Sequence, residues 1–118
     1  EEALKQEFEK MLEYCRSSQD DKVANYIVYR GDDEARNWND ALNYEDESER
    51  EKIVRFRKDI VKDYLKYTNI EYLKYMEQEQ NGKMWYVLQV KFSNETENET
   101  VYFAFLKINE NFVIGDID

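Results

Sequence analysis

The chain has 118 residues and a formal charge of −10, and it contains no proline, no histidine, three glycines and one cysteine. This length is one domain, which buries roughly two-thirds of the surface of the unfolded chain. Aromatic residues make up 15% of the chain, too many for a disordered one. The lack of histidine excludes His-based zinc sites and Ser-His or Cys-His catalytic pairs. A single cysteine, Cys15, excludes an internal disulfide.

Charge and glycine usage exclude further classes of protein. The 17 basic and 27 acidic residues are mixed along the chain without a basic block. A negative surface repels phosphate backbones and anionic membranes, so we expect no nucleic-acid partner. Gly31, Gly82 and Gly115 are isolated, so they cannot form a phosphate-binding loop, and no serine is flanked by glycines. We therefore expect no cofactor and name no catalytic residue.

The first half of the chain predicts helices. Apolar residues recur at three- and four-residue spacing in residues 2–16, which predicts an amphipathic helix. Cys15 continues this stripe, so we expect a buried thiol rather than a reactive one. A second, shorter helix is predicted after a capping carboxylate at Asp20 or Asp21 and before Gly31. Its expected inward face consists of Val23, Ala24, Ile27 and Val28.

A third helix is predicted after an irregular segment, residues 31–47. Ser48 and Glu51 have the spacing of a capping box at its start. The expected apolar stripe of this helix consists of Ile53, Phe56, Ile60, Tyr64 and Tyr67.

The hydrophobic period changes to two after residue 69, which predicts strands. Asn81-Gly82 is a strong hairpin signal and places Tyr75 opposite Leu88 and Leu73 opposite Val90. Two more strands are predicted at residues 101–108 and 112–117. The expected fold is a single α+β domain, residues 1–118, with three N-terminal helices on a curved antiparallel sheet of about four strands.

Both faces of the predicted sheet are apolar, whereas a sheet with one solvated face alternates apolar and polar residues. Either the sheet curls around a helix-filled interior, or its second face meets another subunit or a partner. We favour the second explanation, which makes a homodimer through the sheet possible. The expected interface residues are Trp85, Val87, Tyr102 and Ala104.

Arg30, Arg36 and Trp38 are candidate binding residues in the irregular segment. An arginine can hold a carboxylate with two hydrogen bonds, while Trp38 supplies a wall for stacking. The alternative is a loop pinned to the body of the protein. In that case Trp38 is an apolar plug and Arg36 pairs with a nearby carboxylate.

Tyr75, Tyr86 and Asp116 complete the candidate binding residues. Acid–base chemistry needs a carboxyl group that is desolvated among apolar neighbours, and Glu77 beside Tyr86 and Asp116 near the chain end are the closest fits. The alternative is strand-end carboxylates in water. Asp116 and Asp118, with Asp32 and Asp33, offer oxygen ligands for calcium. Their spacing matches no established loop, so no metal site is expected.

The order of elements resembles the nuclear transport factor 2-like, or cystatin-like, superfamily, whose helices fill the concave side of a curved sheet. Three segments, residues 29–38, 103–108 and 114–118, resemble uncharacterised small lipoprotein or secreted domains of gut Bacteroidetes. This resemblance implies export to the cell envelope, with a signal peptide and a lipid-modified cysteine ahead of residue 1. Since the sequence opens on Glu1, we expect such a targeting segment to be missing from it. Enzymes of the wider superfamily often use a histidine or an aspartate–tyrosine pair, and this chain has no histidine.

The expected function is an exported binding or interaction module without catalytic activity. Its partner would be a protein or a small molecule, and a membrane would be reached only through the lipid anchor. The alternative is a small cone-fold enzyme of the isomerase or dehydratase type that uses a buried carboxylate and a tyrosine. A closed, dry cavity containing an ionisable group would favour the enzyme.

Overall fold

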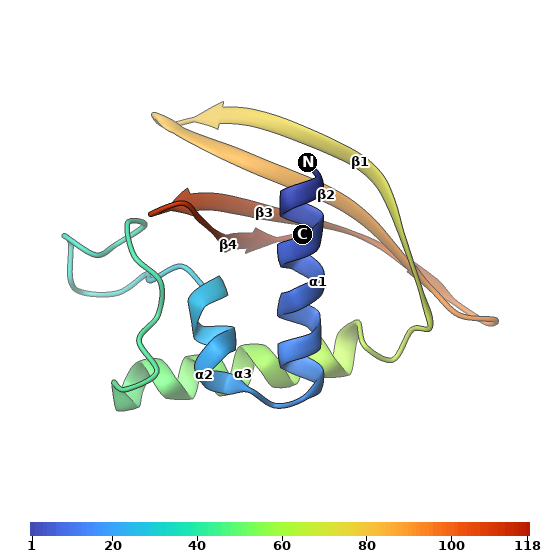
Figure 1. Cartoon of the computed structure of the whole chain (residues 1–118), viewed down its shortest axis with the longest axis horizontal. Helices are drawn as coiled ribbons and strands as arrows, with labels where there is room; N and C mark the ends of the chain where they lie inside the picture. Colours follow the sequence, from blue (N-terminus) through green and yellow to red (C-terminus); the bar gives the residue numbers. More distant parts are fainter.

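The computed structural model describes residues 1–118 and shows an α+β domain in which helices pack on an open, four-stranded antiparallel sheet of order β1-β2-β3-β4 (Figure 1). The α+β prediction is confirmed. All helices precede the strands, although α3 lies in the middle of the chain and is not N-terminal. The elements are α1 (Glu2–Arg16), α2 (Asp20–Val23), the 3-10 turn η1 (Ala24–Tyr26), α3 (Glu47–Asp63), β1 (Asn69–Gln80), β2 (Lys83–Ser93), β3 (Asn98–Ile108) and β4 (Asn111–Ile117).

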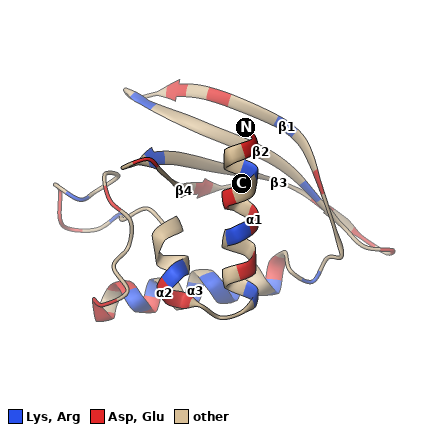
Figure 2. Cartoon of the chain, viewed as in Figure 1, with Lys and Arg blue, Asp and Glu red and all other residues tan.

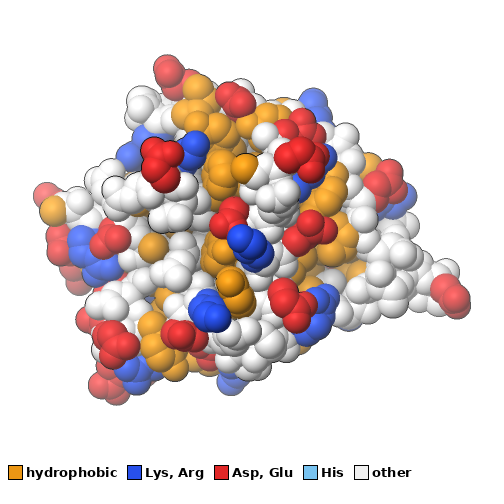
Figure 3. All heavy atoms as spheres, viewed as in Figure 1, with side chains coloured by type: hydrophobic (Ala, Val, Ile, Leu, Met, Phe, Trp, Pro, Cys, Tyr) orange, Lys and Arg blue, Asp and Glu red, His pale blue; other side chains and the backbone are white.

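The helices are amphipathic and cover one face of the sheet. α1 passes in front of the strands in Figure 1, and α3 runs across the lower end of α1. Positions of lysine, arginine, aspartate and glutamate alternate along both helices in Figure 2, and side chains of both charges are interspersed over this face in Figure 3. No helix of the chain has the length and hydrophobicity needed to cross a membrane. The apolar stripe predicted for α1 is buried and consists of Leu4, Phe8, Met11, Leu12 and Cys15.

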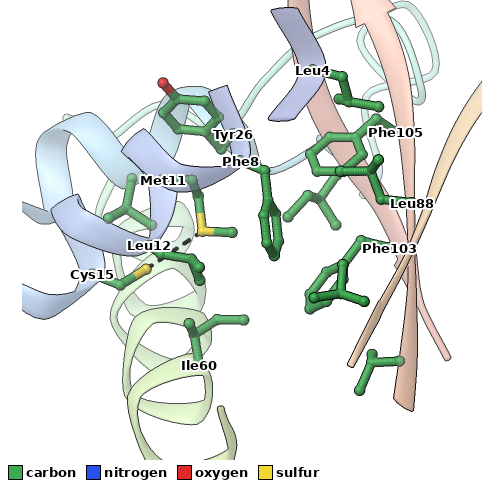
Figure 4. Close-up of a cluster of buried hydrophobic side chains, with 14 of the residues drawn as sticks. Leu4, Phe8, Met11, Leu12, Cys15, Tyr26, Ile60, Leu88, Phe103 and Phe105 are labelled. Carbon is green, nitrogen blue, oxygen red and sulfur yellow. Dashed lines mark hydrogen bonds between the residues drawn. The ribbon is translucent and has the colours of Figure 1, made fainter. Parts of the chain in front are cut away.

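The core lies between α1 and the sheet and is filled with side chains (Figure 4). Phe8 is fully buried, with its ring 4.7 Å from the ring of Phe103 and 6.3 Å from that of Phe105. The thiol of Cys15 lies 3.7 Å from the sulfur of Met11. Burial raises the pKa of Cys15 to about 12, so the thiol stays protonated. The cysteine is therefore part of the core, as its position in the stripe predicts.

The start of α3 differs from the prediction of a capping box at Ser48 and Glu51. The helix begins at Glu47, and the side chain of Asp46 accepts a hydrogen bond from the backbone N–H of Glu49 at 3.1 Å. This bond holds the pKa of Asp46 below its ordinary value. The prediction was wrong because Asp46, in extended conformation, caps the helix two residues before Ser48 by accepting from the free N–H of Glu49.

The second predicted helix is mostly absent. α2 and η1 span only seven residues between them, and Gly31 is not a helix stop. Ile27 pairs with Ile114 of β4 in parallel, and Val28 pairs with Ala41. The backbone N–H of Val28 donates to the carbonyl of Ile114 at 3.0 Å. The prediction failed because this β-branched pair forms strand-like bonds with the free edge of β4.

The β1–β2 hairpin has the predicted register near its turn. Tyr75 lies opposite Leu88, and Asn81 and Gly82 both have positive φ, 54° and 78°, as a two-residue turn of this type requires. The predicted pairing of Leu73 with Val90 is wrong, because the register shifts at Leu73 and Val90 pairs with Tyr72 instead. This bulge turns Tyr72 toward Phe8 of α1, with a ring distance of 6.2 Å, and leaves Leu73 exposed.

Part of the second face of the sheet is covered by the chain itself. Val28, Leu106 and Val113 form a small buried cluster, against which Trp38 and Trp85 pack. The irregular segment predicted at residues 31–47 therefore folds over the face opposite the helices. This covering accounts for part of the apolar second face without another subunit.

Candidate functional site

The uncovered part of the second face contains two neighbouring hollows, which we call together the outer groove. They share Gln80, Trp85 and Asp116. The narrower hollow, about 240 Å³, lies over the predicted interface residues Trp85, Val87, Tyr102 and Ala104. The wider hollow, about 430 Å³, is also lined by Arg30, Trp38, Asn81, Lys83 and Gly115. Both hollows are open to solvent on one side.

Two tryptophans from distant parts of the sequence meet in the groove. The rings of Trp38 and Trp85 are 6.0 Å apart and cross edge to face at 72°. Trp85 lies directly over Gly115, where an added Cβ would be 2.5 Å from Cζ3 of the indole ring. This close approach of a ring to the backbone requires a glycine.

Trp38 is held in an unfavourable backbone conformation. Its φ is +66°, a left-handed value that costs a bulky residue of order 1–3 kcal/mol. Its backbone N–H donates to the carbonyl of Tyr29 at 3.0 Å. Strained residues cluster at binding and active sites, and the surrounding structure must keep them in place.

Arg36 fixes this segment to the body of the protein. Its guanidinium donates two hydrogen bonds to the carboxylate of Glu49, at 2.9 and 3.0 Å, and one to Asp40 at 2.8 Å. It also donates to the carbonyl of Ala41 and lies over the ring of Tyr29. Glu49 is the one buried charged residue of the chain, and the hydrogen bonds from Arg36 hold its pKa below the ordinary value. Arg36 thus has the pairing that the alternative interpretation expected, and it does not line the outer groove.

Three of the predicted binding residues, Arg30, Trp38 and Asp116, line the wider hollow. The guanidinium of Arg30 lies 5.1 Å from the ring centre of Trp38, and its side chain is exposed. Asp116 is exposed as well. The structure therefore brings together residues that are up to 86 positions apart, from Arg30 to Asp116.

Tyr75 and Tyr86 lie elsewhere, on the helix-bearing face. Tyr75 donates a hydrogen bond to Glu77 at 2.7 Å, and burial together with this carboxylate raises the pKa of Tyr75 to about 12. The ring of Tyr86 packs on that of Phe112. Glu77 and Asp116 are both exposed, so neither is the desolvated carboxyl group that acid–base chemistry requires. No group of three or more aspartate, glutamate or cysteine side chains is arranged to hold a metal ion.

The sequence predicted Arg30 and Asp116 as binding residues, but not the glutamines, Asn81 and Lys83 of the groove. Gln80, Asn81 and Lys83 come from the β1–β2 turn, and Gln78 lies opposite Trp85 in the hairpin. The hairpin register, which the sequence does predict, already places Gln78 beside Trp85 on one face.

A scan against protein-family models, a search of curated proteins and a search of solved structures each found no match to this chain. A functional interpretation therefore depends on the geometry of the outer groove.

Proposed function

We propose that the protein is a non-catalytic binding module and that its outer groove binds a carbohydrate. The observation that carries this proposal is the pair of tryptophans, Trp38 and Trp85, in a half-open hollow. Trp38 is strained and is held by a dedicated network around Arg36. An aromatic residue with a strained backbone beside an open hollow is more useful for a ligand than for stability.

The chemistry of the lining supports a sugar. A sugar ring has apolar C–H surfaces and hydroxyl groups at its edge, which both donate and accept hydrogen bonds. Aromatic walls match the C–H surfaces, and the amides of Gln80 and Asn81 can both donate and accept. Asp116 adds an acceptor, and the volume of about 430 Å³ lies in the range of small-molecule sites.

The superfamily and the cellular location of the protein form part of the same proposal. Helices on one face of an open antiparallel sheet support assignment to the cystatin-like, nuclear transport factor 2-like superfamily. Membership in its secreted or lipoprotein branch would place the protein in the cell envelope, as the sequence resemblance implies. A module there meets extracellular polysaccharides.

Intrinsic fluorescence gives a direct test, because the chain has two tryptophans and both line the groove. Titration with maltotriose, cellotriose and trigalacturonic acid should shift the emission for at least one sugar. Trp38→Ala and Trp85→Ala should lose binding by calorimetry, while Tyr44→Ala, at a residue that lines neither hollow, should keep it. If none of the three sugars binds at concentrations up to about 10 mM, the proposal is contradicted.

Self-association through the same face is tested in parallel. Sedimentation of the wild type and of Val87→Asp should show whether Val87, Tyr102 and Ala104 are covered by a second copy. A stable dimer that Val87→Asp dissociates would assign the narrower hollow to an interface instead of a ligand.

A further inference from the structure

The wider hollow contains two cations without carboxylate partners. Neither Arg30 nor Lys83 lies within 4.0 Å of an acidic side chain, although Asp116 lines the same hollow. Arg36 and Arg57, in contrast, are each paired with a carboxylate at 2.8–2.9 Å. In a chain with a net charge of −10, two such cations at one hollow form a local positive site.

The donors of these cations are available. The guanidinium of Arg30 contacts the face of Trp38, a contact that uses none of its N–H groups. Lys83 donates one hydrogen bond, to the side chain of Asn39 at 3.2 Å, which leaves two donors on its ammonium group. Arg30 therefore keeps the planar fork that matches a carboxylate.

We propose that the sugar unit in the wider hollow is a uronic acid, whose carboxylate is bound by Arg30 and Lys83. This inference rests on the proposed function of the outer groove. The ring of the sugar lies against Trp85, and its hydroxyl groups donate to Asp116. Asp116 would repel a second anionic group on the same sugar unit, such as a sulfate, because that group would place like charge against the carboxylate.

The test compares oligomers of the same linkage whose sugar units differ only at C6, which is a carboxylate in one member of each pair and a hydroxymethyl group in the other. Trigalacturonic acid and galactotriose, and the corresponding pair of glucuronic acid and glucose oligomers, are titrated by tryptophan fluorescence and calorimetry. We expect the acidic member of one pair to bind roughly ten-fold more tightly, as one charged hydrogen-bonded contact allows. The preference should shrink in about 0.25 M NaCl, because salt screens exposed charges.

Variants separate the inference from the proposed function. Arg30→Gln should reduce the acidic-to-neutral preference to about two-fold or less, a loss of one charged contact. Lys62→Gln, which removes an exposed charge on α3 far from the groove, is the matched control and should leave the preference intact. Circular dichroism and the unfolding midpoint of each variant show whether it is folded.

Three results would overturn the inference. Equal binding of the acidic and neutral members, unchanged in Arg30→Gln, would leave a sugar site but no carboxylate recognition. Inhibition by sodium phosphate at the concentration at which galacturonate itself binds would indicate a general anion site. The absence of binding by any sugar would overturn the proposed function and this inference with it.

Discussion

Replacing Arg36 by methionine removes the ion pair that joins the Trp38 segment to Glu49 of α3. The carboxylate of Glu49 would keep one hydrogen bond, from the backbone N–H of Asn43 at 2.8 Å, and would lose both bonds from the guanidinium. The Glu49 side chain is 7% exposed, so its charge would stay out of water without a counter-charge.

The expected cost follows from this burial. Breaking a buried ion pair by removing one partner costs about 3–5 kcal/mol. The Arg36 side chain is 27% exposed, so water can reach part of the vacated space, and we expect about 3 kcal/mol. For a domain of this size that loss lowers the melting temperature by roughly 10 °C.

Urea denaturation followed by circular dichroism measures the change, with two companion variants. Arg36→Met combined with Glu49→Met removes both charges and should be more stable than the sum of the two single losses predicts. Arg16→Met is the matched control, because its pair with Glu13 is exposed on both sides and should contribute less than about 0.5 kcal/mol. A loss below about 1 kcal/mol in Arg36→Met, or strict additivity in the double variant, would refute the assignment.

Three further predictions concern Glu49, Gly115 and Cys15. Since the pKa of Glu49 lies below its ordinary value of 4.5, the unfolded chain binds a proton there that the folded chain does not. The contribution of Glu49 to the free energy of unfolding should therefore be complete above about pH 4.5 and be lost as the pH falls through the folded pKa. In Glu49→Gln, the free energy of unfolding measured by urea titration should fall less steeply as the pH is lowered. Gly115→Ala should lose about 1–3 kcal/mol and shift tryptophan emission, because the new Cβ collides with Trp85; unchanged emission and stability would contradict the packing. Cys15 should resist a thiol reagent in the native protein and react once urea unfolds it, whereas rapid native labelling would contradict its burial.

The parts of the fold that follow local rules could be predicted from the sequence. The stripe of α1 and the hairpin turn at Asn81-Gly82 depend on residues close together in the chain, and both are confirmed. The bulge at Leu73 could not be predicted in this way, because it depends on Tyr72 reaching Phe8 of a distant helix. The start of α3 is different, since Asp46 with Glu49 and Ser48 with Glu51 have the same spacing in the sequence, and the local pattern alone does not distinguish them.

The residue types of the candidate site could be predicted from the sequence, but the position of the site in the fold could not. Arg30 and Trp38 stand out in an irregular segment, and Asp116 stands out at the end of a strand. Their meeting depends on where residues 27–42 lie, which is decided by the pair of Arg36 and Glu49 and by Ile27 on the edge of β4. The sequence allows a loop that is pinned to the body by Trp38 and Arg36, but no periodicity shows which face of the sheet such a loop covers.

The bulge at Leu73 has a consequence for how molecules of this protein meet one another. β1 is an edge strand of 12 residues, long enough to serve as a template on which a neighbouring chain could add a strand. The bulge interrupts this template near its middle, and charged side chains at Glu71, Lys74, Glu77 and Glu79 would have to lose water in any such pairing. At the opposite side of the sheet, Ile27 occupies part of the edge of β4. The open sheet is thereby protected against edge-to-edge aggregation at both sides, and its face is the surface left for recognition.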